Sequence, residues 1–244
     1  MKLPAATRIH VSDTLSTENF MHTVRVWDLP TRLFHWSLAV CVIGLVVTGN
    51  VGGNWMNGHQ WLGYAVFTLL LFRLVWGFAG GHWSRFSAFL YGPGSIVAYL
   101  RGFNGQPQLG HNPLGALAVF ALLGVLLAQV GSGLFADDEI AFAGPLVALV
   151  SGEWVSRATS YHKDLGKFLL LGLVALHLLA IAYYRLVRKA RLVGPMISGD
   201  KLVDAPAIGS ADSTGTRLLA LGVLALCAGI VYAVVQLGSG APAY

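Results

Sequence analysis

The sequence predicts an all-α integral membrane protein in which a four-helix transmembrane bundle is followed by a fifth, C-terminal transmembrane helix. The chain of 244 residues is 55% hydrophobic and only 11% charged, whereas soluble globular proteins carry about 25% charged residues. Five apolar stretches approach the roughly 17–25 residues that a helix needs to cross about 30 Å of hydrocarbon. The net charge of +5 is small and scattered along the chain, which excludes a nucleic-acid-binding protein.

The predicted spans are apolar runs bounded by polar or glycine-rich segments, and they cover residues 33–48, 61–78, 114–135, 165–186 and 218–237. Residues 87–100 are expected to include a short helix at the interface. The weaker apolar stretch 140–150 is broken by Gly144 and Pro145, so it is expected to form an outer loop. Residues 191–212 contain Gly, Pro and Asp and are expected to form a loop as well.

The basic residues predict the orientation of the spans. Thirteen of the 16 Lys and Arg residues fall on the side of the N-terminus, and the other side holds Arg157, Lys163 and Lys167 together with an acidic run at 137–139. The positive-inside rule therefore places the N-terminus in the cytoplasm and the C-terminus outside. The chain then divides into a polar tail at 1–24, a core at 25–190, a cytoplasmic loop at 191–215, and a fifth helix with an outer tail at 216–244.

The cysteines and the N-terminal segment exclude several other assignments. Cys41 and Cys227 lie in apolar runs far apart, and no C-x-x-C-H occurs. Covalent c-type haem and cysteine-based zinc or iron–sulfur sites are therefore excluded. The first 20 residues are polar, so we expect no cleavable signal peptide and expect the first span to act as the insertion signal.

Four of the eight histidines lie in or at the ends of the predicted spans, namely His35, His59, His162 and His177. Ionisable residues are costly in lipid and usually face the bundle interior or a ligand. A neutral imidazole is also the commonest side-chain ligand of transition metals and a frequent haem ligand. His10 and His22 lie in the polar tail, where solvated side chains are expected.

The spacing of His162 and His177 predicts two separate sites. Their 15-residue separation on one helix is a little over four turns, so both face nearly the same direction about 22 Å apart. The alternating direction of the spans puts His35 at the depth of His177, in the cytoplasmic half, and His59 at the depth of His162, at the outer rim. Two bis-histidine haems follow, His35 and His177 on the inner iron and His59 and His162 on the outer iron. The alternative is a set of hydrogen-bonded structural histidines.

Other candidate contacts surround these pairs. His111 is a candidate for a haem-propionate contact, a quinone site or an inner ligand, or for an ordinary helix-start residue, and His82 is expected to be an interfacial residue. The basic residues at span ends are candidates for pairing with haem propionates or are snorkelling anchors, namely Arg32, Arg73, Lys163 and Lys167. The acidic run 137–139 is either a docking patch for a basic electron-transfer partner or an ordinary solvated loop.

Several motifs resemble the bacterial cytochrome b561 family, which includes the cytochrome b subunits of nickel–iron hydrogenases. They are VWDLPTRLFHW at 26–36, GHNPLGA at 110–116, HKDLGK at 162–167, LHLLA at 176–180 and LVGPMISG at 192–199. The resemblance implies a four-helix core with two non-covalent b haems that exchanges electrons with membrane quinone. It also implies paired ligands on the first, second and fourth helices, at His35, His59, His162 and His177. The fifth span lies outside the family's four-helix core.

The preferred function is a diheme b-type cytochrome that transfers electrons between a periplasmic redox partner, such as a hydrogenase-type subunit or a c-type cytochrome, and the quinone pool. One alternative is a stand-alone quinone reductase that uses a small diffusible donor such as superoxide. Another is a haem-free membrane scaffold or transporter. Transporters often contain repeats and discontinuous midplane helices, and the sequence shows neither.

Overall fold

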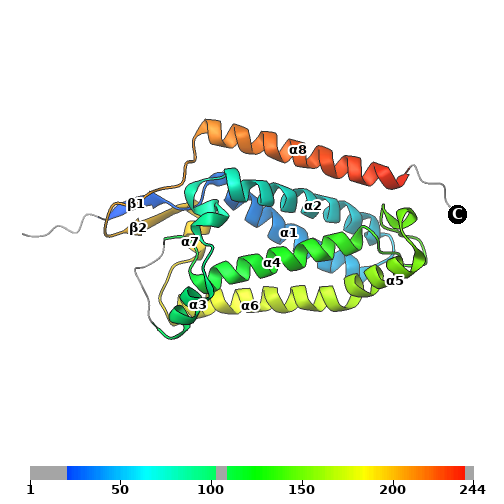
Figure 1. Ribbon diagram of the computed structural model, residues 1–244, viewed down its shortest axis with the longest axis horizontal. Helices are drawn as coiled ribbons and strands as arrows, with labels where there is room; N and C mark the ends of the chain where they lie inside the picture. The colour runs from blue at the N-terminus through cyan, green and yellow to red at the C-terminus, as the bar shows by residue number, and fades with distance from the viewer. Residues whose placement is uncertain (1–20, 103–108, 240–244) are drawn as a thin grey trace, which may run out of the picture.

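The computed structural model describes residues 21–102 and 109–239, which form an elongated helical bundle (Figure 1). Five helical segments are long and apolar enough to cross a membrane. They are α1 (Leu29–Val51), α2 (Trp55–Ala79), α4 (Pro113–Gly133), the continuous helix formed by α5 (Gly152–Ser160), η4 (Tyr161–Leu165) and α6 (Gly166–Leu186), and α8 (Thr214–Ser239). Each overlaps one of the five predicted spans. His10, with most of the predicted N-terminal tail, and residues 240–244 lie outside the described residues.

Side-chain caps and prolines define where two of these helices begin. The Asp28 side chain accepts a hydrogen bond from the Thr31 amide at the start of α1, and Asn112 accepts one from the Gly115 amide at the start of α4. Both helices carry a proline in the first turn, where its fixed φ angle suits a helix and its missing amide proton is not needed. These caps extend the first helix four residues upstream of the predicted span at 33–48.

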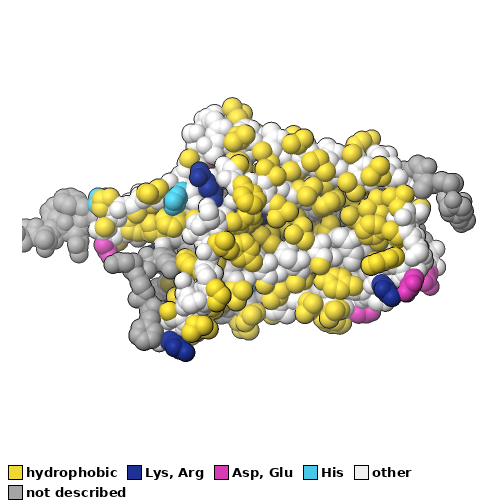
Figure 2. Space-filling view, viewed as in Figure 1, with side chains coloured by type: hydrophobic (Ala, Val, Ile, Leu, Met, Phe, Trp, Pro, Cys, Tyr) yellow, Lys and Arg dark blue, Asp and Glu magenta, His cyan; other side chains and the backbone are white. Residues whose placement is uncertain are grey.

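The helices pack as a four-helix core with α8 added at one side. Helix α2 contacts α1, α4 and α8, and α6 contacts α4; Figure 1 shows α8 lying along α2. The core contains Val66, Leu70 and Trp76 of α2, all fully buried, and α8 contributes the buried Cys227. Large aliphatic side chains cover the outside of the bundle, and Figure 2 shows the charged groups of that face mainly towards its ends. This distribution is the one expected for helices that face lipid.

The fourth span is longer and less regular than predicted. The helix from Gly152 to Leu186 runs for 35 residues, whereas about 20 suffice to cross a bilayer. Its turn at Tyr161–Leu165 is π-helical, a form that appears mostly as single turns within α-helices and often at functional sites. His162 lies in this turn, so the spacing to His177 is not that of one uniform α-helix.

Short elements fill the connections. The predicted interfacial segment 87–100 contains η2 (Phe86–Ala88) and α3 (Pro93–Leu100), and η1 (His82–Ser84) precedes it. The stretch 140–150 forms turns and η3 (Val147–Leu149). It does not form a span.

A two-stranded antiparallel sheet joins the N-terminal segment to the connection after α6, and it is an addition to the expected all-α fold. Strand β1 (His22–Arg25) pairs with β2 (Asp200–Val203), with His22 opposite Val203 and Arg25 opposite Asp200. Helix α7 (Val193–Ser198) precedes β2. The segment predicted as a loop at 191–212 is therefore partly ordered structure. We call the end of the bundle that carries this sheet the sheet end and the opposite end the α5 end (Figure 1).

Gly199 allows the close approach that this junction requires. Its φ angle is +92°, and a β-carbon there would lie 2.7 Å from the carbonyl oxygen of Trp27. The Gly199 carbonyl accepts hydrogen bonds from the amides of Val26 and Trp27. Both the left-handed backbone and the contact distance favour glycine over any other residue.

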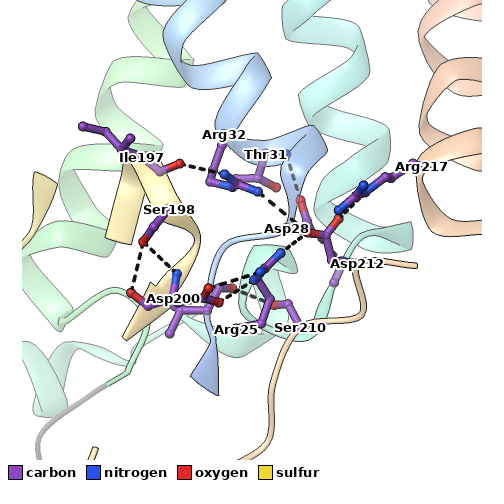
Figure 3. Close-up of polar contacts among 12 residues, drawn as sticks. Arg25, Asp28, Thr31, Arg32, Ile197, Ser198, Asp200, Ser210, Asp212 and Arg217 are labelled. Atoms are coloured by element: carbon purple, nitrogen blue, oxygen red, sulfur yellow. Dashed lines mark hydrogen bonds and ion pairs between the residues drawn. The ribbon is translucent and has the colours of Figure 1, made fainter. Parts of the chain in front are cut away.

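A nearly buried carboxylate, Asp212, connects three basic side chains at the sheet end (Figure 3). It pairs with Arg25 and, at 3.0 Å, with Arg217 at the start of α8, and Arg32 of α1 lies 3.7 Å away. Burial raises the pKa of the Asp212 carboxyl, but hydrogen bonds from Arg217, the Leu29 amide and Arg25 outweigh it and hold the pKa below its usual value. The cluster therefore ties β1, α1 and α8 together.

An Asp212→Asn variant is expected to lower the free energy of unfolding by about 1–3 kcal/mol, because it weakens several charge-assisted hydrogen bonds. Since the pKa is lower in the folded state, the ionised carboxylate stabilises the fold fully above the unfolded pKa of about 3.9, and this contribution is lost as the pH falls below that value and through the lower folded pKa. Thermal unfolding in detergent at pH 7 and at about pH 2 measures both effects. The exposed Asp204→Asn variant is the control, and equal melting curves for the two variants would contradict the expectation.

Candidate functional site

The structure brings the four span histidines together as two pairs at opposite ends of the bundle. At the α5 end, the ring centroids of His59 on α2 and His162 in η4 are 6.0 Å apart, with an interplanar angle of 86°. At the sheet end, the centroids of His35 on α1 and His177 on α6 are 6.5 Å apart, with an angle of 54°. These are the two pairs that the depth argument predicts.

Both separations suit an iron held between two imidazoles. An imidazole nitrogen lies about 2.0 Å from its metal and the ring centre about 1.2 Å further back, so two ligating rings have centroids about 6.4 Å apart. Among residues 21–102 and 109–239, no group of three or more His, Cys, Asp or Glu side chains is placed to hold a metal ion. Two protein ligands suffice for haem iron, because the porphyrin supplies the other four nitrogens. The donor set therefore fits haem.

Backbone carbonyls orient the imidazoles of the α5-end pair. The Nδ1 atom of His59 lies 3.1 Å from the carbonyl oxygen of Leu45, and Nδ1 of His162 lies 2.8 Å from that of Gln129. A carbonyl oxygen only accepts, so Nδ1 carries the proton in both rings and Nε2 keeps its lone pair. This tautomer leaves Nε2 free to bind a metal.

The sheet-end pair has a different environment. The Nδ1 atom of His35 is buried and has no hydrogen-bond partner in the described part of the chain, and the same is true of His111 Nδ1. The His111 ring lies between Trp27 and Phe89, with centroid distances of 4.7 and 4.6 Å. Burial, and then the nearby charge of Arg73, lowers the pKa of His111 to about 3. His111 is therefore a neutral side chain beside this pair.

Two arginines at the sheet end have donors that could bind carboxylates. Arg73 is only 4% exposed, its guanidinium lies 4.6 Å from the Phe86 ring centroid, and its Nη1 has no partner among the described residues. Arg32 donates from Nη1 to the Ile197 carbonyl at 2.7 Å, while its buried Nε is unpartnered in the same part of the chain. Buried donors without acceptors are costly, and haem propionates would satisfy them.

The other basic and acidic candidates lie at the α5 end. Lys163 is exposed, and Lys167 lies 5.1 Å from the Phe168 ring centroid. In the acidic run, Asp138 Oδ1 accepts three backbone hydrogen bonds, from residues 140–142, and these bonds lower the pKa of its carboxyl. Asp138 therefore stabilises its own loop.

Comparison with known proteins identifies the family. A family model described as prokaryotic cytochrome b561 matches residues 26–199, more than half of the chain. The chain belongs to this family. The resemblance inferred from the sequence motifs is thereby confirmed. This cytochrome b561 family member is thus a mostly helical, multi-pass membrane protein that uses haem b in membrane electron transfer. The family match ends at Gly199, so β2 and α8 lie outside it.

The curated relatives of this cytochrome carry hydrogenase-related names. A probable Ni/Fe-hydrogenase B-type cytochrome subunit from Azotobacter chroococcum is 27% identical over 72% of this chain and 87% of the relative. Proteins with the same name from Bradyrhizobium diazoefficiens and Cupriavidus necator are 26% and 25% identical, over 73% and 71% of this chain and 86% and 85% of their own lengths. No solved structure matches the chain.

Proposed function

We propose that this protein is a diheme b-type cytochrome that transfers electrons across the bacterial inner membrane. His35 and His177 bind one haem iron at the sheet end, and His59 and His162 bind the other at the α5 end. The observation that carries this proposal is the pair of imidazole separations, 6.5 and 6.0 Å, at the two ends of one bundle. When bound, the haems supply one-electron redox chemistry, and the protein fixes their axial ligands and surroundings.

The residues of the bundle have three tasks in this proposal. The paired imidazoles present neutral nitrogens from opposite sides of each site. Arg32, Arg73 and His111 offer buried donors at the sheet end, where propionates would accept them, and Lys163 is a candidate for the same role at the α5 end. The apolar side chains around both pairs exclude water, which strengthens every electrostatic contact to the haems.

The distribution of charge supports an orientation, and the relatives' names support a partner. The sheet end carries most of the basic residues, and we assign it to the cytoplasmic side by the positive-inside rule. The α5 end then faces the periplasm, where a hydrogenase-type subunit or another electron-transfer protein exchanges electrons with the nearer haem. Membrane quinone is the second redox partner. The names of the curated relatives support a hydrogenase-type partner.

Haem content tests this proposal directly. We expect two b haems per chain from a pyridine haemochrome assay of the detergent-purified protein, with a reduced-minus-oxidised spectrum of the b type. One haem per chain would mean that one histidine pair is structural. A folded protein without haem would overturn the proposed function.

A further inference from the structure

Two helices present the same local arrangement to the two histidines of the α5-end pair. On α1, Thr48 and Gly49 lie beside His59, and on α4, Ser132 and Gly133 lie beside His162. In each case a hydroxyl residue directly precedes a glycine, and the carbonyl that binds Nδ1 belongs to the residue four positions before that glycine. Neither dipeptide lies in the motifs at 26–36, 110–116, 162–167, 176–180 and 192–199.

The hydroxyls act as second acceptors for the Nδ1 protons. Thr48 Oγ1 lies 3.3 Å from His59 Nδ1, and it donates its own proton to the Gly44 carbonyl at 2.7 Å. Ser132 Oγ lies 3.4 Å from His162 Nδ1 and donates to the Gln129 carbonyl at 3.0 Å. Because each hydroxyl proton is already used, the oxygen can only accept from the imidazole. Each Nδ1–H group is therefore shared between a carbonyl and a hydroxyl oxygen.

The glycines make room for the rings. A β-carbon at position 49 would lie 3.0 Å from Cε1 of His59, and one at position 133 would lie 2.8 Å from Cε1 of His162. Real β-carbon contacts are rarely this short, so any side chain at either position would displace the imidazole. A β-carbon built at Gly131, two residues before Gly133 on α4, or at Gly63 on α2 would have no neighbouring atom within 4 Å. Other helix glycines, such as Gly44 against Leu62 at 2.8 Å, are packed against other kinds of side chain, whereas Gly49 and Gly133 pack against an imidazole.

We propose that Thr48–Gly49 and Ser132–Gly133 are two matching cradles that position the Nε2 atoms of His59 and His162 and lower the redox potential of the haem at the α5 end. The inference rests on the proposed function. Hydrogen bonds from Nδ1–H increase the electron donation of an imidazole ligand, which favours the oxidised iron. The cradle residues are positioning residues that act through the histidines.

The sheet-end pair lacks this arrangement in the described residues. His35 Nδ1 has no acceptor there, and the positive charge of Arg73 near His111 is buried, whereas Lys163 near His162 is exposed and screened by water. A weaker ligand donor and a nearby positive charge both favour the reduced iron. The α5-end haem therefore has the lower potential, and electron transfer is downhill from the α5 end to the sheet end.

Redox titration of a Thr48→Val variant tests the effect of the Thr48 hydroxyl on the haem potential. Valine keeps the shape of threonine and removes the acceptor, so we expect the midpoint potential of the α5-end haem to rise while that of the sheet-end haem stays unchanged. Thr48→Ser restores the hydroxyl and should restore the wild-type potential. Thr68→Val is the matched control, because Thr68 donates to the Tyr64 carbonyl in the same way and has no hydrogen bond to a histidine among the described residues. An unshifted potential in Thr48→Val, or an equal shift in Thr68→Val, would overturn the inference.

A Gly133→Ala variant tests whether the His162 ring needs the space that Gly133 leaves. We expect displacement of the His162 ring, seen as loss of the α5-end haem or a changed low-spin spectrum, while Gly131→Ala retains both haems and the wild-type spectrum. Identical spectra for the two variants would refute the role of the glycine. Folded wild-type protein without haem would overturn the proposed function and this inference together, whereas two haems with insensitive potentials and spectra would overturn the inference alone.

Discussion

A His177→Ala variant is expected to bind about half the haem of the wild-type protein, and a His162→Ala variant is expected to lose the other half. Each imidazole lies opposite a single partner, at 6.5 Å for His177 and 6.0 Å for His162. Removing one ring leaves the iron of that pair with one protein ligand and leaves the other pair intact. Pyridine haemochrome quantitation together with redox titration shows which haem remains.

Two further variants make this expectation specific. His82→Ala is a control, because this ring contacts its neighbour Trp83 with centroids 4.8 Å apart and belongs to neither pair. His111→Ala addresses the alternative in which His111 replaces an inner ligand, and we expect it to retain both haems. Full haem content in His177→Ala with loss in His111→Ala would reassign the sheet-end ligand to His111.

Replacing Asp28 by alanine is expected to cause the largest loss of stability at the sheet end. The Asp28 carboxylate is fully buried and accepts hydrogen bonds from the Thr31 amide at 2.8 Å, the Gly81 amide at 3.0 Å and Ser84 Oγ at 2.8 Å. Trp76 Nε1 lies 3.3 Å from both of its oxygens. Removing the carboxylate leaves several buried donors without acceptors, at about 1–3 kcal/mol each.

We therefore expect Asp28→Ala to lower the free energy of unfolding by about 3–5 kcal/mol, the range seen when one partner of a buried charged network is removed. Thermal unfolding in detergent measures it, with the exposed Asp204→Ala as the control. Haem content at the α5 end should be less affected than at the sheet end, because Asp28 lies seven residues before His35 on the same chain segment. A melting temperature equal to that of the control would show that the network does not stabilise the fold.

Much of the architecture is readable from the sequence because lipid imposes strong local rules. A spanning helix must satisfy its own backbone hydrogen bonds and must be apolar over its whole length, so each span leaves a continuous signal. The histidines stand out against that background, and alternating span direction is enough to match His35 with His177 and His59 with His162 in depth. The motif at 26–36 likewise contains both the cap residue Asp28 and the ligand candidate His35 in one local pattern.

The tertiary structure decided the features that depend on contacts between distant residues. The Ser210 hydroxyl donates to the Val26 carbonyl across 184 positions, and strands of four residues are too short to show a reliable alternation of side chains. The Asp212 cluster and the packing of α8 along α2 also depend on contacts between residues that are far apart in the sequence.

The sequence likewise does not reveal the π-helical turn at His162 or the cradles at Gly49 and Gly133. A glycine in a membrane helix suggests only close packing, and it is the approach of an imidazole to 3.0 and 2.8 Å that gives these two glycines a specific role. The membrane helices and the predicted pairing of the histidines can be read from the sequence, because both follow from periodicity and depth. The surroundings of each imidazole become visible only in the folded protein, because those contacts join side chains and carbonyls of different helices.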